Sequence, residues 1–207
     1  MSRRSRGFTI IEVMVVISIV AIVLAMVVPN FATMMQNSRL GSAAKSYLVG
    51  IQTARAEAIR RNLPVEFVTT DTTLTGDFAN SAVAANGGKG WVVRAPDVTA
   101  SAAGTYVPVE AKAALEGSGQ SATATVRISG AVTAPTAGAF SGVLAFNGLG
   151  GTLNGETIVF DIDNPTGGAC AAASGPMRCQ RIQVRPGGQV TLCDPAAAAG
   201  DSRACPF

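Results

Sequence analysis

The stretch G-F-T-I-I-E-V-M-V-V-I-S-I-V-A-I-V-L-A-M-V-V, from Gly7 to Val28, decides the fold of this chain. Its part from Phe8 to Val28 is 21 residues long and contains one charged residue, Glu12. At 1.5 Å per residue it makes about 32 Å of helix, and a bilayer core is about 30 Å thick, so we expect a membrane-spanning helix. Three arginines precede it: Arg3, Arg4 and Arg6. By the positive-inside rule, they predict a cytoplasmic N-terminus.

Two features distinguish this stretch from an ordinary signal anchor. A carboxylate among apolar residues costs on the order of 2–3 kcal/mol, so Glu12 needs a partner or a proton. A secretory signal has a small-residue cleavage site after a shorter apolar region. Here no A-x-A motif follows the run, and the marked junction, Gly7-Phe8, precedes it.

The basic leader, the Gly7-Phe8 pair, Glu12 and Pro29 just beyond the apolar run resemble the N-terminus of type IV pilin-like precursors. The resemblance implies that prepilin peptidase cuts between Gly7 and Phe8 and that Phe8 is then N-methylated. It also implies that Glu12 meets the free amine of a neighbouring subunit, because an ammonium and a carboxylate neutralise each other in a low dielectric. We therefore expect a cleaved leader (1–7), a transmembrane and filament-core helix (8–28) and an extramembrane domain (29–207).

Beyond Pro29 the apolar residues recur at helical spacing up to about Asn62. They are Leu40, Ala44, Tyr47, Leu48, Ile51, Ala54 and Ala58. One long helix from Phe8 to about Asn62 is predicted, exposed to lipid before Pro29 and half-buried after it. Gly41 and Gly50 each weaken its second half by up to about 1 kcal/mol relative to Ala.

The end of this helix reads A-R-A-E-A-I-R-R-N, Ala54 to Asn62. It resembles the segment that marks the FimT/GspH subgroup of minor pilins and pseudopilins, in which Ser is usual at the position of Ala56. We interpret its charged residues as a solvated helix face, with Glu57 and Arg61 an i,i+4 pair. The others are Arg55 and Arg60.

Residues 64–207 read as a β domain of short segments separated by turn residues. The expected strands are Val65–Thr70, Trp91–Ala95, Tyr106–Val109, Thr123–Ser129, Val143–Asn147, Thr157–Ile162, Cys179–Arg185 and Gln189–Cys193. Pro186-Gly187-Gly188 joins the last two into a hairpin. Trp91 is expected in the core, and the small-residue regions 71–89 and 97–122 as surface loops. The predicted fold class is α+β: a long N-terminal transmembrane-to-amphipathic helix packed on an antiparallel β-sheet domain.

Composition restricts the chemistry. The chain has 16 basic and 13 acidic residues, and removal of Arg3, Arg4 and Arg6 leaves 13 of each, which gives no argument for a nucleic-acid partner. Histidine is absent, so His-based catalysis and His metal ligation are excluded. No G-x-S-x-G or phosphate-loop motif occurs. Asp161 and Asp163 with Asn164 could hold a cation, but the EF-hand positions are incomplete, and we favour a solvated strand end. No enzyme, cofactor or metal is predicted.

All four cysteines lie near the C-terminus: Cys170, Cys179, Cys193 and Cys205. An even number in a translocated domain predicts disulfides, and three connectivities are open. We favour pairing of neighbours, Cys170 with Cys179 and Cys193 with Cys205, because each bond would close a loop with little core of its own.

The resemblance implies a structural subunit, a minor pilin or pseudopilin of a type IV pilus or a type II secretion pseudopilus. Its expected partners are other pilins and prepilin peptidase, and it is expected in the bacterial inner membrane, N-terminus cytoplasmic and C-terminal domain periplasmic, until it enters a filament. The alternative is a DNA-binding minor pilin that acts in DNA uptake through basic residues near the C-terminus. Those candidates are Arg178, Arg181 and Arg185. A periplasmic enzyme on a signal anchor is a third hypothesis, which no motif supports.

Overall fold

The computed structural model describes residues 9–71, 74, 76–102, 104–113, 127–134 and 137–205, and for residues 26–30 and 127–129 it describes the backbone alone. The chain divides into two compact units, residues 1–35 and 36–207. Helix α1, Ile10–Arg61, is 52 residues long and contributes to both. The predicted long helix is therefore confirmed over the described residues, and Phe8 lies outside them.

Helix α1 ends in a Schellman motif. The Asn62 N–H donates to the Ile59 carbonyl and the Leu63 N–H to the Ala58 carbonyl, both at 3.3 Å. Asn62 has φ +52°, the left-handed conformation that Asn tolerates better than most residues. The sequence predicted the helix end here from Pro64. The motif also explains why Asn occupies position 62, where a residue in the left-handed conformation is needed.

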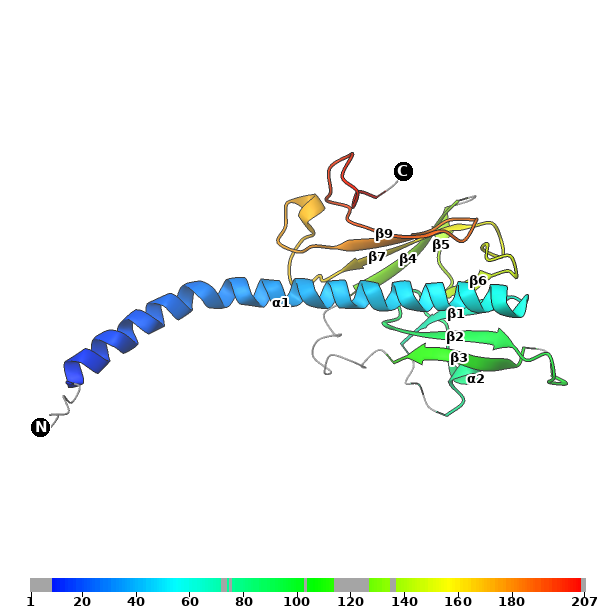
Figure 1. Ribbon diagram of the computed structural model, residues 1–207, viewed down its shortest axis with the longest axis horizontal. Helices are drawn as coiled ribbons and strands as arrows, with labels where there is room; N and C mark the ends of the chain where they lie inside the picture. Colours follow the sequence, from blue (N-terminus) through cyan, green and yellow to red (C-terminus); the bar gives the residue numbers. More distant parts are fainter. Residues whose placement is uncertain are drawn as a thin grey trace, which may run out of the picture. The chain divides into compact units, whose positions relative to one another are not determined.

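The described strands form two antiparallel sheets, with the second half of α1 alongside them in the larger unit (Figure 1). The four-stranded sheet has the order β3-β2-β1-β6. Its strands are β1 (Val65–Thr70), β2 (Gly90–Pro96), β3 (Tyr106–Lys112) and β6 (Val143–Phe146). The five-stranded sheet has the order β5-β4-β7-β8-β9. Its strands are β4 (Arg127–Ala134), β5 (Gly138–Ala139), β7 (Thr157–Asp163), β8 (Gln180–Val184) and β9 (Val190–Cys193).

The α+β fold class is confirmed, and most strands agree with expectation to within one residue. Strand β1 has the predicted bounds, and β8 and β9 form the predicted hairpin. Strand β3 runs on to Lys112, beyond the predicted Val109. The expected strand Thr123–Ser129 was predicted to end too early, because β4 runs from Arg127 on to Ala134; its residues 123–126 lie outside the described part.

Three short elements were not predicted. The region 71–89, expected as loop, contains the four-residue helix α2, Phe78–Ser81. The two-residue strand β5 pairs with β4. The 3-10 turn η1, Ala171–Ala173, lies in the cysteine-rich segment. Each is too short to carry a periodic pattern, so a sequence window of 11–18 residues cannot detect it.

One core joins α1 to both sheets. The helix contributes Leu40, Ala44, Tyr47, Ile51, Ala54 and Ala58, all at most 1% exposed. The Tyr47 ring contacts Phe67 from the four-stranded sheet and Phe160 from the five-stranded sheet, edge to face, with centroids 5.6 and 6.0 Å apart. Trp91 is 3% exposed, which confirms it as a core residue. Burial raises the pKa of Tyr47 well above its usual range, so its hydroxyl stays protonated and donates to the Gly88 carbonyl.

Gly50 is required where α1 crosses the four-stranded sheet. A Cβ at this position would lie 2.8 Å from ring carbons of both Phe67 and Trp91, closer than carbon atoms pack. A Cβ at Gly41 would have Gln180 Nε2 at 3.9 Å as its nearest neighbour, an ordinary contact. The two helix glycines, equivalent in the sequence pattern, therefore differ in what the fold demands of them.

Candidate assembly sites

The N-terminal candidate site is the start of α1. Gly7 and Phe8, the expected processing junction, lie outside the described residues. Thr9 precedes the helix, and its Oγ1 accepts a hydrogen bond from the Glu12 N–H at 3.3 Å. Thr9 is thus the N-cap of α1, and Glu12 lies at the N3 position. A carboxylate in the first turn also interacts favourably with the helix dipole. This N-cap role of Thr9 was not predicted, although a Thr directly before an apolar helix signals it.

Around Glu12 the helix surface is apolar and exposed. The large apolar side chains from Ile10 to Leu24 are between 47% and 79% exposed. Among the described residues, no cation lies in ion-pair contact with Glu12. An exposed apolar surface of this kind is typical of a segment that packs against lipid or other protein chains.

In the part of the chain that the structure describes, no helix contains an apolar stretch long enough to cross a bilayer.

The predicted span, Phe8 to Val28, is described only in part. Phe8 is not described, and neither are the side chains of residues 26–28. The span stays a prediction.

The second candidate site is the charged end of α1. Glu57 Oε2 accepts hydrogen bonds from Arg60 at 2.6 Å and from Arg61 at 2.8 Å, which confirms the expected pair with Arg61. The hydrogen bonds from Arg60 and then Arg61 lower the pKa of Glu57 from 4.5 to about 2. Arg60 is 63% exposed, so this part of the motif is the solvated helix face that the sequence predicted.

Arg55 was wrongly placed on that solvated face. Its Nε donates to the Gly150 carbonyl at 3.0 Å, and its Nη2 lies 3.5 Å from the Gly187 carbonyl. Gly150 lies in the loop after β6, and Gly187 lies in the β8–β9 turn. Arg55 therefore joins the helix to one loop of each sheet.

Gly188 allows the β8–β9 turn to approach the loop that contains Gly150. A Cβ there would lie 1.7 Å from the Gly150 carbonyl oxygen, and Gly188 has φ +71°. Only glycine fits both the space and the backbone conformation.

The C-terminal arginines do not form one free basic surface. Arg181 pairs with Asp161 through two hydrogen bonds, Nε to Oδ1 at 2.7 Å and Nη2 to Oδ2 at 3.1 Å. Arg178 is exposed, and its N–H donates to Asn37 Oδ1 at 2.8 Å. Arg185 is half-buried beside the β8–β9 turn. The bidentate pair with Asp161 neutralises the central arginine of the candidate DNA-binding set.

The Asp161-x-Asp163-Asn164 segment is also engaged internally. Asp161 is the partner of Arg181. Asn164 is 1% exposed, and its Oδ1 accepts hydrogen bonds from the Thr166 N–H and hydroxyl and from the Gly167 N–H. Among the described residues there is no group of three or more Asp, Glu or Cys side chains arranged to hold a metal ion.

Both favoured disulfides are present. Cys170 pairs with Cys179 and Cys193 with Cys205, with Cα atoms 5.4 and 4.8 Å apart. The first loop is attached to α1 through Asn37, whose Nδ2 donates to the Pro176 carbonyl at 3.3 Å. The disulfides thus secure the C-terminal segment, and the first also covers the helix where the larger unit begins.

Comparisons with known proteins match the N-terminal segment and the larger unit separately. The family model of the prokaryotic N-terminal methylation motif matches residues 2–28, and that of type II transport protein GspH matches residues 43–188. No curated protein matches the chain. Two crystal forms of the Pseudomonas aeruginosa PAO1 type IV minor pilin FimU are similar, each at 15% identity. They cover 77% and 81% of this chain and 97% of the FimU chain, with TM-scores of 0.45 and 0.48.

Proposed function

Because the chain belongs to the family of type II transport protein GspH and carries the N-terminal methylation motif, we propose that it is a minor pilin or pseudopilin that works by assembly into a filament. Prepilin peptidase removes residues 1–7 and Phe8 is methylated. The helix from Phe8 to Val28 holds the subunit in the inner membrane and then packs in the filament core. The filament is a type IV pilus or the pseudopilus of type II secretion.

The observation that carries the proposal is the contrast between the two units. Residues 36–207 bury a core of their own, whereas the apolar side chains of the smaller unit, from Ile10 onward, are mostly exposed. Transfer of such side chains out of water yields roughly 25 cal/mol per Å². A lipid bilayer or the helices of other subunits supply that environment. The subunit uses the bilayer before assembly and the helices of its neighbours in the filament.

Glu12 is proposed to favour the filament over the membrane. Its carboxylate lies on an apolar helix surface, where lipid offers it no counter-charge. The methylated amine at Phe8 of a neighbouring subunit provides that counter-charge. The leader arginines orient the helix with its N-terminus in the cytoplasm. The disulfides agree with an oxidising periplasm on the other side.

We do not extend the proposal to DNA uptake. The bidentate Asp161–Arg181 pair reduces the positive charge of the candidate surface. No aromatic side chain stands among these arginines in the sequence to stack on bases.

The test combines intact-mass spectrometry with measurement of filament incorporation. We expect the mature chain to begin at methylated Phe8. Glu12→Ala should be inserted and cleaved normally but be depleted from sheared filaments. Ser18→Ala is the matched control, because the Ser18 hydroxyl only donates to the Met14 carbonyl of its own helix. A retained leader, or equal incorporation of Glu12→Ala and the wild type, would contradict the proposal. Secretion and twitching assays of a deletion strain then identify the machine.

A further inference from the structure

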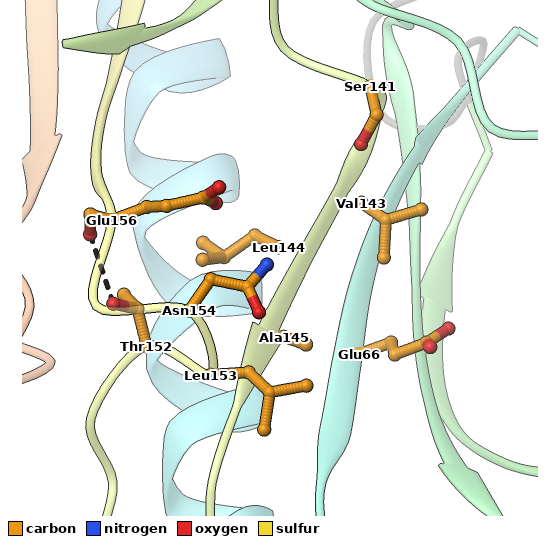
Figure 2. Close-up of a pocket in the computed structure, with 9 residues that line it drawn as sticks. All are labelled: Glu66, Ser141, Val143, Leu144, Ala145, Thr152, Leu153, Asn154 and Glu156. Carbon is orange, nitrogen blue, oxygen red and sulfur yellow. Dashed lines mark hydrogen bonds between the residues drawn. The ribbon is translucent and has the colours of Figure 1, made fainter. Parts of the chain in front are cut away.

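A pocket of about 230 Å³ lies at the edge of the four-stranded sheet, between β6 and the segment that follows it (Figure 2). Two hydrogen bonds hold the segment 152–156, which forms one side of the pocket. The Leu153 N–H donates to the Ala145 carbonyl of β6 at 2.8 Å. Thr152 Oγ1 donates to the Glu156 carbonyl at 3.0 Å, the dashed line in Figure 2. One backbone and one side-chain hydrogen bond therefore fix the course of the chain on this side of the pocket.

The lining combines acidic groups with an apolar wall. Figure 2 shows Glu66 and Glu156 on opposite sides, with Val143 and Leu153 among the side chains around them. Leu153 is 50% exposed. An exposed leucine beside a carboxylate favours a ligand with both an apolar and a charged part.

The charges of this pocket do not balance. Glu66 Oε2 accepts from Arg94 Nε at 2.8 Å, and Glu66 Oε1 accepts from the Tyr106 hydroxyl at 3.2 Å. Among the described residues, the Glu156 carboxylate has neither an ion-pair nor a hydrogen-bond partner. Glu66, Arg94 and Glu156 together leave one negative charge, so the charge complementary to the pocket is a cation.

The backbone indicates that the ligand is a polypeptide. The Ala145 carbonyl points outward from the sheet, toward Leu153. Since residues two apart on a strand present their main chain to the same side, the Val143 main chain also points to this edge. The Ala145 carbonyl is occupied by the Leu153 N–H, so the part of this edge that can pair with an extended segment of another chain is the Val143 main chain.

We propose that this pocket is a docking site for a lysine or arginine side chain of a neighbouring filament subunit. The alkyl stem of that side chain lies against Leu153, and its charged head is bound by Glu156, with Glu66 on the far side. This inference rests on the proposed function, because it needs the chain to lie in a filament.

The experiment uses the full chain in its host, with a photo-crosslinking amino acid in place of Leu153. The same substitution at Leu149, which is 90% exposed and is not among the residues that line the pocket, is the control. We expect a crosslink from position 153 to another filament subunit, several-fold stronger than from position 149. Mass spectrometry should place Lys or Arg within the crosslinked peptide.

Glu156→Gln should reduce the 153 crosslink several-fold. Glu110→Gln, at an exposed carboxylate on β3, should leave it unchanged. A crosslink that is insensitive to Glu156→Gln, absent from the filament fraction or made to a protein outside the filament would overturn the inference. Immunoblotting of sheared filaments separates the two proposals. If the wild-type chain is missing from filaments, the proposed function fails; if it is present and position 153 does not crosslink, the docking site alone fails.

Discussion

Replacement of the two glycines of the domain half of α1 by alanine should change stability in opposite directions. In a helix interior, Gly is up to about 1 kcal/mol less favourable than Ala. Helix propensity alone therefore predicts that Gly41→Ala and Gly50→Ala both stabilise the chain. The packing around the two positions predicts otherwise.

At Gly50 the new methyl group would lie 2.8 Å from the Phe67 and Trp91 rings, which are both buried. Overpacking of a core typically costs about 1–3 kcal/mol, and the middle of that range exceeds the helix gain and leaves a net loss of about 1 kcal/mol. At Gly41 the nearest atom is 3.9 Å away, so the gain of about 0.5–1 kcal/mol remains. The two variants should therefore differ by about 2 kcal/mol, or about 4–8 °C in Tm.

The fluorescence of Trp91 during urea unfolding measures this difference. Trp91 is the single tryptophan of the chain, and its indole N–H donates to Ser46 Oγ of α1 at 3.0 Å, so its signal reports the contact between helix and sheet. The full chain in detergent micelles is suitable, because no other tryptophan contributes. If both variants raised the urea midpoint, or both lowered it by the same amount, the packing argument would be wrong.

Three further predictions concern the charged and disulfide-bonded groups. Arg55→Ala should lower the free energy of unfolding by about 2 kcal/mol, because a charged hydrogen bond is lost. In the same urea assay, Arg60→Ala, at an exposed arginine, should change it by less than about 0.5 kcal/mol. Equal effects would contradict the role of Arg55. The pKa of Glu57 is about 2 in the folded chain, below its ordinary value of 4.5. The wild type should therefore lose stability relative to Glu57→Gln as the pH falls from about 4.5 toward 2. A difference in urea midpoint that stays constant over this range would refute the prediction. Non-reducing peptide mapping should recover the Cys170–Cys179 link, and its removal by Ser substitution should cost up to about 3 kcal/mol; free thiols at both positions would disprove the pairing.

The sequence predicted strands in which apolar and polar residues alternate strongly, and the helix in which apolar residues recur over many turns. Strand β1 follows Pro64 and reads V-E-F-V-T-T, with Val65 and Phe67 on the core face, and its bounds were predicted correctly. Strand β4 reads R-I-S-G-A-V-T-A. Its small residues give a weak alternation, and its register comes from pairing with β7, which no local window contains.

The candidate sites likewise divide into contacts that are local in sequence, which were predicted, and contacts made by the tertiary fold, which were not. The pair Glu57–Arg61 is local, and i,i+4 spacing predicts it directly. Arg55 lies on the same helix, but its partners Gly150 and Gly187 are 95 and 132 residues further along the chain. Side-chain pairs at such separation are set by the tertiary fold, and the sequence pattern of the helix alone assigned Arg55 to solvent.

The attachment of Asn37 to the first disulfide loop has a consequence for the order of folding. Asn37 Oδ1 accepts its hydrogen bond from the N–H of Arg178, 141 residues later. Contacts between residues so distant in sequence form slowly, because the long intervening chain must be ordered first. Synthesis therefore delivers the helix long before the strands that cover it, and Tyr47 lacks its Phe160 contact until β7 has been made. During that interval the nascent domain presents an apolar helix face to chaperones and proteases, and the exposure ends when the strands of both sheets pack on the helix.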